Sequence, residues 1–411
     1  MFNFAQIPLW SVAIFPALIF FLWLLFRFQQ KDKKQQSTLS SEYFKGLNYL
    51  LNDEQAKALD IFVKLVESDW NTIDTHFALG KIYRKNGEMD KAIKIHQGLI
   101  GRPSLPEKYR SKILLELGFD YLDAGWLDRA EGLFKEVLIE DKSSQIARHN
   151  LVLIYQQEKD WYKAIDVATE LFADDPVMTG PMIAQYYCEL AAMAKLKGDI
   201  VQLRHKANKA LVFDKHCVRA TILLAEQAES ESDDKAAIAF YESIEAQDVE
   251  SMTLVLNAML ACHMRLSTLE SFYHYLQALE QRQEKLFLQT VTAEVLEETK
   301  SKSDSVEYLS EKLKQKPSLE GMQKLLSYHS TEVDGQQIYE NLKLAISRMQ
   351  QERMQHSCRR CGFKTNTHYW LCPSCHHWGQ IKPSIGQICK ISQYEENNMK
   401  PPINEKAAKH E

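Results

Sequence analysis

The chain has 411 residues, enough for about two to three domains of ordinary size. Hydrophobic residues make up 45% of it and charged residues 26%, which excludes a collagen-like chain, a wholly disordered chain and a many-pass membrane protein. The 50 lysines and arginines nearly balance 55 aspartates and glutamates, and the net charge of -5 implies no nucleic-acid or anionic-lipid partner for the molecule as a whole. Glycine (15) and proline (11) are scarce, which favours helices joined by short loops over turn-rich sandwiches and barrels.

The first predicted element is a membrane-spanning helix over residues 7–26. This stretch reads IPLWSVAIFPALIFFLWLLF and holds 20 residues without a charge, so as a helix it spans the roughly 30 Å of bilayer hydrocarbon. A cleaved signal peptide is the alternative, but the segment lacks a positively charged start, a short apolar core and a small-residue cleavage site. We therefore expect residues 1–27 to be a membrane anchor.

The charges beside this segment predict its orientation. No lysine or arginine precedes it, whereas four follow it directly: Arg27, Lys31, Lys33 and Lys34. The positive-inside rule then places everything after Phe26 in the cytoplasm and the N-terminus on the other side of the membrane. Residues 28–38 form a basic juxtamembrane linker in this interpretation. The aromatic-rich span is either a passive tether or also a recognition element for another membrane protein.

Four copies of a repeat follow the linker. Tyrosines recur at intervals of 34, 38 and 34 residues, and an alanine lies nine residues after each: Tyr49 and Ala58, Tyr83 and Ala92, Tyr121 and Ala130, Tyr155 and Ala164. A glycine precedes each of the first three tyrosines by three residues: Gly46, Gly80 and Gly118. Phe62 and Phe134 stand four residues after their alanines. This register predicts a pair of antiparallel helices per unit, in which small residues let the two backbones approach and large ones fill the space between units.

The pattern resembles the tetratricopeptide repeat. The resemblance is clear over residues 39–178 and degenerate over residues 184–350, and it implies an all-α fold in which residues 39–350 form a right-handed superhelical solenoid. Such solenoids are binding scaffolds rather than enzymes, because stacking creates a long concave groove and no enclosed polar pocket. Four histidines in this region lack ligand or triad spacing and are expected at the surface or half-buried: His76, His96, His149 and His205.

Two Cys-x-x-Cys pairs give the strongest chemical signal in the chain. Cys358 and Cys361 form the first pair, and Cys372 and Cys375 form the second after ten intervening residues. Two such pairs can bring four thiolates to one tetrahedral metal ion, and a disulfide is disfavoured in the reducing cytoplasm. The sequence therefore predicts one tetrathiolate ion, either structural zinc or iron in a rubredoxin-like site that could carry one electron.

The residues around these cysteines predict a small metal-stabilised module over residues 353–391. A unit of this size cannot rely on its own core, and three aromatic residues are expected to dock it onto the end of the solenoid: Tyr369, Trp370 and Trp378. Four flanking histidines are alternative ligands, although four cysteines already complete the shell: His356, His368, His376 and His377. Its basic residues and a tetrathiolate ion together leave a charge of about +4, which suits an acidic protein surface, lipid headgroups or nucleic acid.

The other cysteines are predicted to have no part in metal binding. Cys188, Cys217 and Cys262 lie too far apart in the sequence to pair and are expected to be buried packing residues. Cys389 is isolated. The polar residues 392–411 are predicted to be a disordered tail.

The order of these parts resembles the lipopolysaccharide assembly protein B family of Gram-negative bacteria. The stretch SCRRCGFKTNTHYWLCPSCHHWGQIKP looks like the metal module of that family, including its Cys-Gly-Phe, Tyr-Trp-x-Cys-Pro and Trp-Gly elements. The resemblance implies metal ligation by Cys358, Cys361, Cys372 and Cys375. It also implies a single-pass protein of the bacterial inner membrane, with its N-terminus in the periplasm, that is not an enzyme.

The same resemblance implies an adaptor that regulates lipopolysaccharide synthesis. Such an adaptor presents the deacetylase that commits the cell to lipid A synthesis to a membrane-bound, ATP-dependent zinc protease. Further implied partners are other inner-membrane lipopolysaccharide regulators and the lipid bilayer, whereas nucleic acid is not expected and a homo-oligomer is left open. Two other functions stay open from the residues themselves: a rubredoxin-like electron carrier on a repeat scaffold, and a nucleic-acid-binding zinc ribbon.

Overall fold

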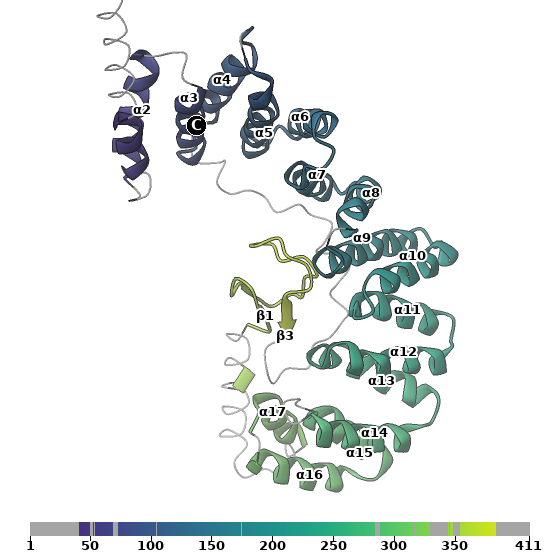
Figure 1. Cartoon of the computed structure of the whole chain (residues 1–411). Coiled ribbons are helices and arrows are strands. Elements are labelled where there is room, and N and C mark those ends of the chain that lie inside the picture. The colour runs from purple at the N-terminus through teal and green to yellow at the C-terminus, as the bar shows by residue number, and fades with distance from the viewer. Residues whose placement is uncertain are drawn as a thin grey trace, which may run out of the picture. The chain divides into compact units, whose positions relative to one another are not determined.

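The computed structural model (Figure 1) describes residues 41–383, apart from 50–51, 53, 69–72, 104, 174, 284–287, 316, 329–343, 345 and 348–353. The predicted membrane segment, the basic linker, Cys389 and the predicted tail lie outside these residues. Among the helices that the structure does describe, none combines the length and the apolar character needed to cross a bilayer.

The chain divides into two compact units, with the boundary between residues 159 and 160. The first unit opens with a helical segment over residues 41–49. Its further helices are α2 (Gln55–Ser68), α3 (Ile73–Lys85), α4 (Met89–Ile100), α5 (Glu107–Asp123), α6 (Leu127–Glu140) and α7 (Gln145–Glu158).

The second unit holds the remaining helices and all three strands that the structure describes. Its helices are α8 (Trp161–Phe172), α9 (Pro176–Leu196), α10 (Ile200–Phe213), α11 (Val218–Ser230), α12 (Asp234–Gln247), the 3-10 turn η1 (Val249–Ser251), α13 (Met252–Arg265), α14 (Leu269–Arg282), α15 (Gln289–Thr299), α16 (Lys302–Gln315) and α17 (Leu319–Tyr328). Successive helices pack as hairpins, among them α3 with α4, α9 with α10, and α15 with α16. The predicted helical hairpins are therefore confirmed over the residues that the structure describes, among them α13 with α14 and α15 with α16 beyond residue 250.

The glycines of the repeat lie where two helices of a hairpin approach most closely. A Cβ atom added to Gly118 in α5 would lie 2.8 Å from the ring of Phe134 in α6, and one added to Gly46 would lie 2.8 Å from the ring of Phe62. Neither distance leaves room for a methyl group. The repeated glycine and the repeated phenylalanine thus pack against each other. Gly125, in the turn after α5, has a φ of +78°, which explains the glycine in that turn.

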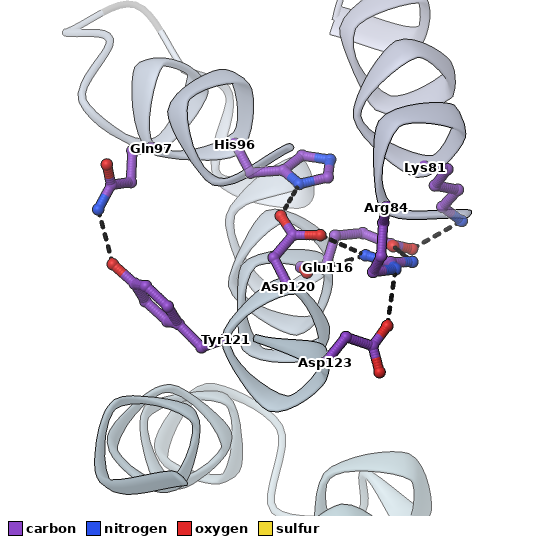
Figure 2. A network of polar contacts seen from close by, with 8 residues as sticks. All are labelled: Lys81, Arg84, His96, Gln97, Glu116, Asp120, Tyr121 and Asp123. Carbon is purple, nitrogen blue, oxygen red and sulfur yellow. Dashed lines mark hydrogen bonds and ion pairs between the residues drawn. The ribbon is translucent and has the colours of Figure 1, made fainter. Parts of the chain in front are cut away.

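The second hairpin replaces this apolar contact by a buried polar network (Figure 2). His96, four residues after Ala92, occupies the position of the phenylalanine, and a Cβ atom on Gly80 would lie 2.5 Å from its imidazole. The Nδ1 atom of His96 lies 2.5 Å from an oxygen of Asp120. Arg84 donates to the other oxygen of Asp120 at 2.7 Å and to Glu116 at 2.8 Å. Both His96 and Asp120 are completely buried.

The expected positions of the repeat histidines are therefore partly wrong. His96 and His76 are buried, whereas His149 and His205 are exposed. Burial is tolerated because each of the two buried rings has a polar partner: Asp120 for His96, and the guanidinium of Arg102, at 3.1 Å, for His76.

A small antiparallel sheet follows the helices. Its strands are β1 (His356–Cys358), β2 (Lys364–Thr365) and β3 (Ile381–Pro383), in the order β2-β1-β3. His356 pairs with Thr365 on one side and with Pro383 on the other. This sheet carries the first of the four predicted ligands.

Candidate metal centre

The structure brings the four predicted thiols together. Cys358 ends β1 and Cys361 follows in the next turn, while Cys372 and Cys375 lie in a second turn before β3. All four sulfur atoms lie within 4.8 Å of one another, with Cys358 and Cys375 at 3.7 Å and Cys361 and Cys372 at 3.8 Å. Four sulfurs placed about 2.3 Å from a central ion have edges of about 3.8 Å. The donor set thus fits one tetrahedrally bound metal ion.

Each Cys-x-x-Cys pair forms a similar backbone turn. The amide of Gly362 donates to the carbonyl of Cys358, and the amide of His376 donates to the carbonyl of Cys372. Both residues follow the second cysteine of their pair and have positive φ angles, +75° for Gly362 and +53° for His376. The predicted alternative ligand His376 is therefore a turn residue, and the two turns hold their sulfurs toward a common centre.

The thiols of the cluster differ in their ionisation. The backbone amide of Phe363 lowers the pKa of Cys361 to about 6, because it donates to the sulfur and stabilises the thiolate. Loss of hydration, with a smaller effect of the neighbouring thiols, raises the pKa of Cys375 to about 12. Four thiolates in contact repel one another unless a cation lies between them. The cluster consequently favours a bound divalent or trivalent ion at neutral pH.

Two of the flanking histidines belong to the core of the module. His356 and His368 are buried, their ring centres lie 5.3 Å apart, and Trp370 lies 4.7 Å from His368. Burial lowers the pKa of His356 to about 4 and that of His368 to about 3, so both rings are neutral packing groups at pH 7. The Nδ1 atom of His377 contacts the backbone carbonyl of Cys375. None of the four histidines lies within the described sulfur cluster.

Two tryptophans of the module pack against the repeats of the same unit. The ring of Trp378 lies edge-on to Trp161 in α8, at 6.3 Å, and to Tyr186 in α9, at 6.1 Å. The guanidinium carbon of Arg219 in α11 lies 5.8 Å from the ring of Trp370 and 5.9 Å from that of Trp378. Trp370 also packs against the large apolar core formed by α11 to α15. Trp370 and Trp378 are confirmed as docking residues, whereas Tyr369 packs within the module.

Two ion pairs lie at the edge of this contact. Lys382 lies 2.5 Å from Asp248, and Arg359, inside the first Cys-x-x-Cys pair, lies 3.0 Å from Glu250. Burial would raise the pKa of Asp248, but the hydrogen bonds from Lys382 and Ser251 lower it below its ordinary value. Both acidic residues belong to the connection between α12 and α13 around η1. The acidic surface that suits the basic module is thus provided by the chain itself.

The predicted docking position needs a correction. The sequence predicts the module at the end of the solenoid, but its aromatic and charged contacts are with α8, α9, α11 and η1, and helices α14 to α17 follow this region in the chain (Figure 1). The reason is chemical. The aromatic partners of the module, Trp161 and Tyr186, belong to α8 and α9, and its acidic partners, Asp248 and Glu250, lie at η1.

Comparisons with known proteins agree with these features. Residues 356–383 match the family described as rubredoxin metal binding domain, and residues 75–106 match the tetratricopeptide repeat family. Lipopolysaccharide assembly protein B of Escherichia coli (strain K12) is 30% identical over 361 residues, which cover 87% of this chain and 93% of that protein. The protein of the same name from Haemophilus influenzae is 29% identical over 374 residues, 88% of this chain and 94% of the other. A tetratricopeptide repeat protein from Parabacteroides merdae aligns with 51% of this chain and 78% of its own at 14% identity, with a TM-score of 0.31.

Proposed function

The chain belongs to the lipopolysaccharide assembly protein B family, and from this membership we propose that it is a membrane-anchored adaptor in lipopolysaccharide assembly. Its repeats hold the deacetylase that commits the cell to lipid A synthesis, and its N-terminal segment meets a membrane-bound, ATP-dependent zinc protease that degrades this deacetylase. The similarity over 87% of the chain, together with the docked four-thiol module, is the observation that supports this proposal.

The four clustered cysteines are the proposed metal ligands: Cys358, Cys361, Cys372 and Cys375. A zinc ion there is purely structural, whereas iron adds a one-electron couple. In either case the ion holds both turns in place. The first turn carries Arg359, and the second lies just before Trp378. The proposed role of the module is to hold α8, α9, α11 and η1 in one arrangement. The surface of these repeats is then preorganised for a partner, which lowers the entropy lost on binding.

Tethering provides the proposed mechanism. An adaptor that binds the protease through residues 1–27 and the deacetylase through its repeats turns their encounter into an intramolecular event. The effective concentration of one near the other then reaches about the millimolar range expected of short connections. Degradation is accelerated by proximity, and the adaptor itself carries out no chemical step.

The docking contacts weigh against the alternative function, that of a nucleic-acid-binding zinc ribbon. Arg359 and Lys382, two of the basic residues of the module, are engaged by Glu250 and Asp248. The remaining basic charge is small for a protein that must neutralise several phosphates.

A pull-down from native membranes tests the proposal. The full chain, with residues 1–40 intact, serves as bait, and the same chain without residues 1–27 serves as the control. We expect the full chain to retain both the protease and the deacetylase, and the shortened chain to lose the protease but keep the deacetylase. Retention of neither protein by the full chain would contradict the adaptor function.

A further inference from the structure

Two cysteines outside the metal centre are in contact with each other. The sulfur atoms of Cys188, in the middle of α9, and Cys217, the residue before α11, lie 3.6 Å apart. Both side chains are buried, as expected, but the prediction that they lie too far apart to pair is wrong. Their separation of 29 residues is close to one repeat, so the fold places them side by side in consecutive hairpins.

The surroundings of the pair give its two thiols different roles. Cys217 lies at the start of α11, and the thiol hydrogen bond from Cys188 lowers its pKa, with further help from the backbone amide of Ala220 and the charge of Arg219. Burial raises the pKa of Cys188 well above its ordinary value. Gln185 also donates a hydrogen bond to the sulfur of Cys217 at 3.7 Å. Cys217 is the nucleophile of the pair, and Cys188 keeps its proton beside it.

We propose that Cys188 and Cys217 form a reversible disulfide when the protein meets hydrogen peroxide. The thiolate of Cys217 attacks one peroxide oxygen, the O–O bond breaks, and hydroxide leaves to give a sulfenic acid on Cys217. This hydroxide takes the proton of Cys188 and becomes the first water, and the Cys188 thiolate attacks the sulfur of Cys217. The S–O bond breaks as the S–S bond forms, and the leaving hydroxide takes up the proton that Cys217 lost on ionisation, which gives the second water. Two thiols and one peroxide thus yield one disulfide and two waters.

Forming this bond requires only a small movement. A disulfide has a sulfur separation of about 2.05 Å, so the two sulfurs must approach by roughly 1.5 Å. Hydrogen peroxide is small enough to reach a buried thiol through local opening of the fold, which larger disulfide oxidants do less readily. The bond would join α9 covalently to the start of α11.

The position of the pair gives this modification a consequence for the metal module. Tyr186, two residues before Cys188, contacts Trp378, and Arg219, two residues after Cys217, contacts both docking tryptophans. A disulfide between Cys188 and Cys217 therefore links the two repeat helices on which the module rests. The oxidised chain therefore has a disulfide next to the docking surface of the metal module.

Peptide mapping of the full-length, metal-loaded protein tests the proposal. The protein is treated with hydrogen peroxide, its remaining thiols are alkylated under denaturing conditions, and tryptic peptides are analysed by mass spectrometry. We expect a linked pair of peptides that contains Cys188 and Cys217, disappears on treatment with a phosphine reductant and is absent from the Cys188→Ala and Cys217→Ala variants. The linkage is measured on the unmodified sequence, so the result does not depend on how the variants fold.

Cys262 provides a matched internal control. It is completely buried in the same unit, and burial raises its pKa to about 12. The described partners of its sulfur are the guanidinium of Arg265, at 3.2 Å, and the carboxyl group of Asp234, and neither is a thiol that could resolve a sulfenic acid. We expect at least about tenfold less oxidation of Cys262 than of the pair. Absence of the linked peptides while the metal ligands oxidise, or equal oxidation of Cys262, would overturn the proposal.

Discussion

The second hairpin of the first unit and the metal module of the second unit are both held by charged side chains, but over very different distances along the chain. His96 and Asp120 are 24 residues apart, whereas Arg359 and Glu250 are 109 residues apart. The first contact arises because the second helix of one hairpin, α4, packs against the first helix of the next, α5. The second depends on a module that must fold around its metal before its partners can meet. The two regions should therefore respond differently to metal loss, to mutation and to pH.

Metal removal should produce the largest difference between the two regions. A chelator, or the Cys372→Ser/Cys375→Ser variant, removes a binding free energy of about 10 kcal/mol or more that small metal domains use for folding. We expect the module to unfold and to be cleaved rapidly by trypsin after Arg360 and Lys364, while the first unit keeps its protection. The Cys389→Ser variant is the control for the loss of a thiol and should behave like the unmodified protein. Equal protection of the module with and without metal would contradict this account.

The buried network of the first unit should be the next most sensitive feature. Asp120→Ala removes the carboxylate that the buried His96 and the half-buried Arg84 share, which should lower the free energy of unfolding by about 3–5 kcal/mol. The matched control is Asp60→Ala, because Asp60 is exposed and its ion pair with Lys64 contributes about 0.3–0.5 kcal/mol. Urea unfolding followed by circular dichroism measures both. A cost for Asp120→Ala no larger than that for Asp60→Ala would show that the network is not stabilising.

Truncation of Trp378 should weaken docking without removing the metal. The ring contacts Trp161, Tyr186 and Arg219, and its loss should cost about 2–3 kcal/mol, less than a fully buried aromatic residue because the side chain is only half-buried. We expect Trp378→Ala to accelerate proteolysis of the module while one equivalent of metal is retained. Trp126→Ala, at a position 44% exposed in the first unit, is the control. Loss of the metal in Trp378→Ala would mean that docking and metal binding cannot be separated.

Acid should destabilise the first unit through Glu116. Burial alone would raise the pKa of this carboxylate, but hydrogen bonds from Lys81 and Arg84 lower it below the ordinary value of 4.5. The folded state therefore favours the ionised form, and the resulting stabilisation is present above pH 4.5 and is lost as the pH falls through the lowered pKa. The thermal midpoint of the Glu116→Gln variant should depend less on pH in this range than that of the unmodified protein. Identical pH profiles would contradict the assignment.

The smallest expected effect concerns the ion pair between Arg359 and Glu250. Both side chains are about half exposed, at 47% and 51%, so the pair should contribute only about 0.2–1 kcal/mol and should weaken at high salt. A double-mutant cycle with Arg359→Gln and Glu250→Gln, read out by proteolysis of the module, measures this coupling. A coupling above about 2 kcal/mol, unchanged by salt, would show that the pair is a main determinant of docking.

Much of the fold could be predicted because its contacts repeat in the sequence. The spacing of Tyr83 and Ala92 from Tyr121 and Ala130 reflects the stacking of one hairpin on the next. The polar network was available to the same reasoning, since His96 occupies the register position of Phe62 and Phe134. A histidine in place of a phenylalanine was the signal, and a buried acidic partner on the next hairpin is its physical consequence.

The candidate site could be predicted only in part. The spacing within each Cys-x-x-Cys pair is local, so the sulfur cluster followed from the sequence. The docking position could not be predicted. The partners of Trp378 and Arg359 belong to elements that are far apart in the sequence, and they do not recur at a regular spacing. The contact between Cys188 and Cys217 was not predicted from their distance along the chain. That distance is close to one repeat, and the stacking of consecutive hairpins brings such residues side by side.

The lifetime of the lipid A-committing deacetylase in cells tests the central claim most directly. Its half-life after translation arrest should be compared in cells that carry the unmodified chain, the Cys372→Ser/Cys375→Ser variant or no chain, with Cys389→Ser as the control. We predict rapid turnover with the unmodified chain and with Cys389→Ser, and several-fold slower turnover in the other two cases. An unchanged half-life in cells without the chain would contradict the adaptor function, and an unchanged half-life with the ligand variant would contradict a role for the metal module in it.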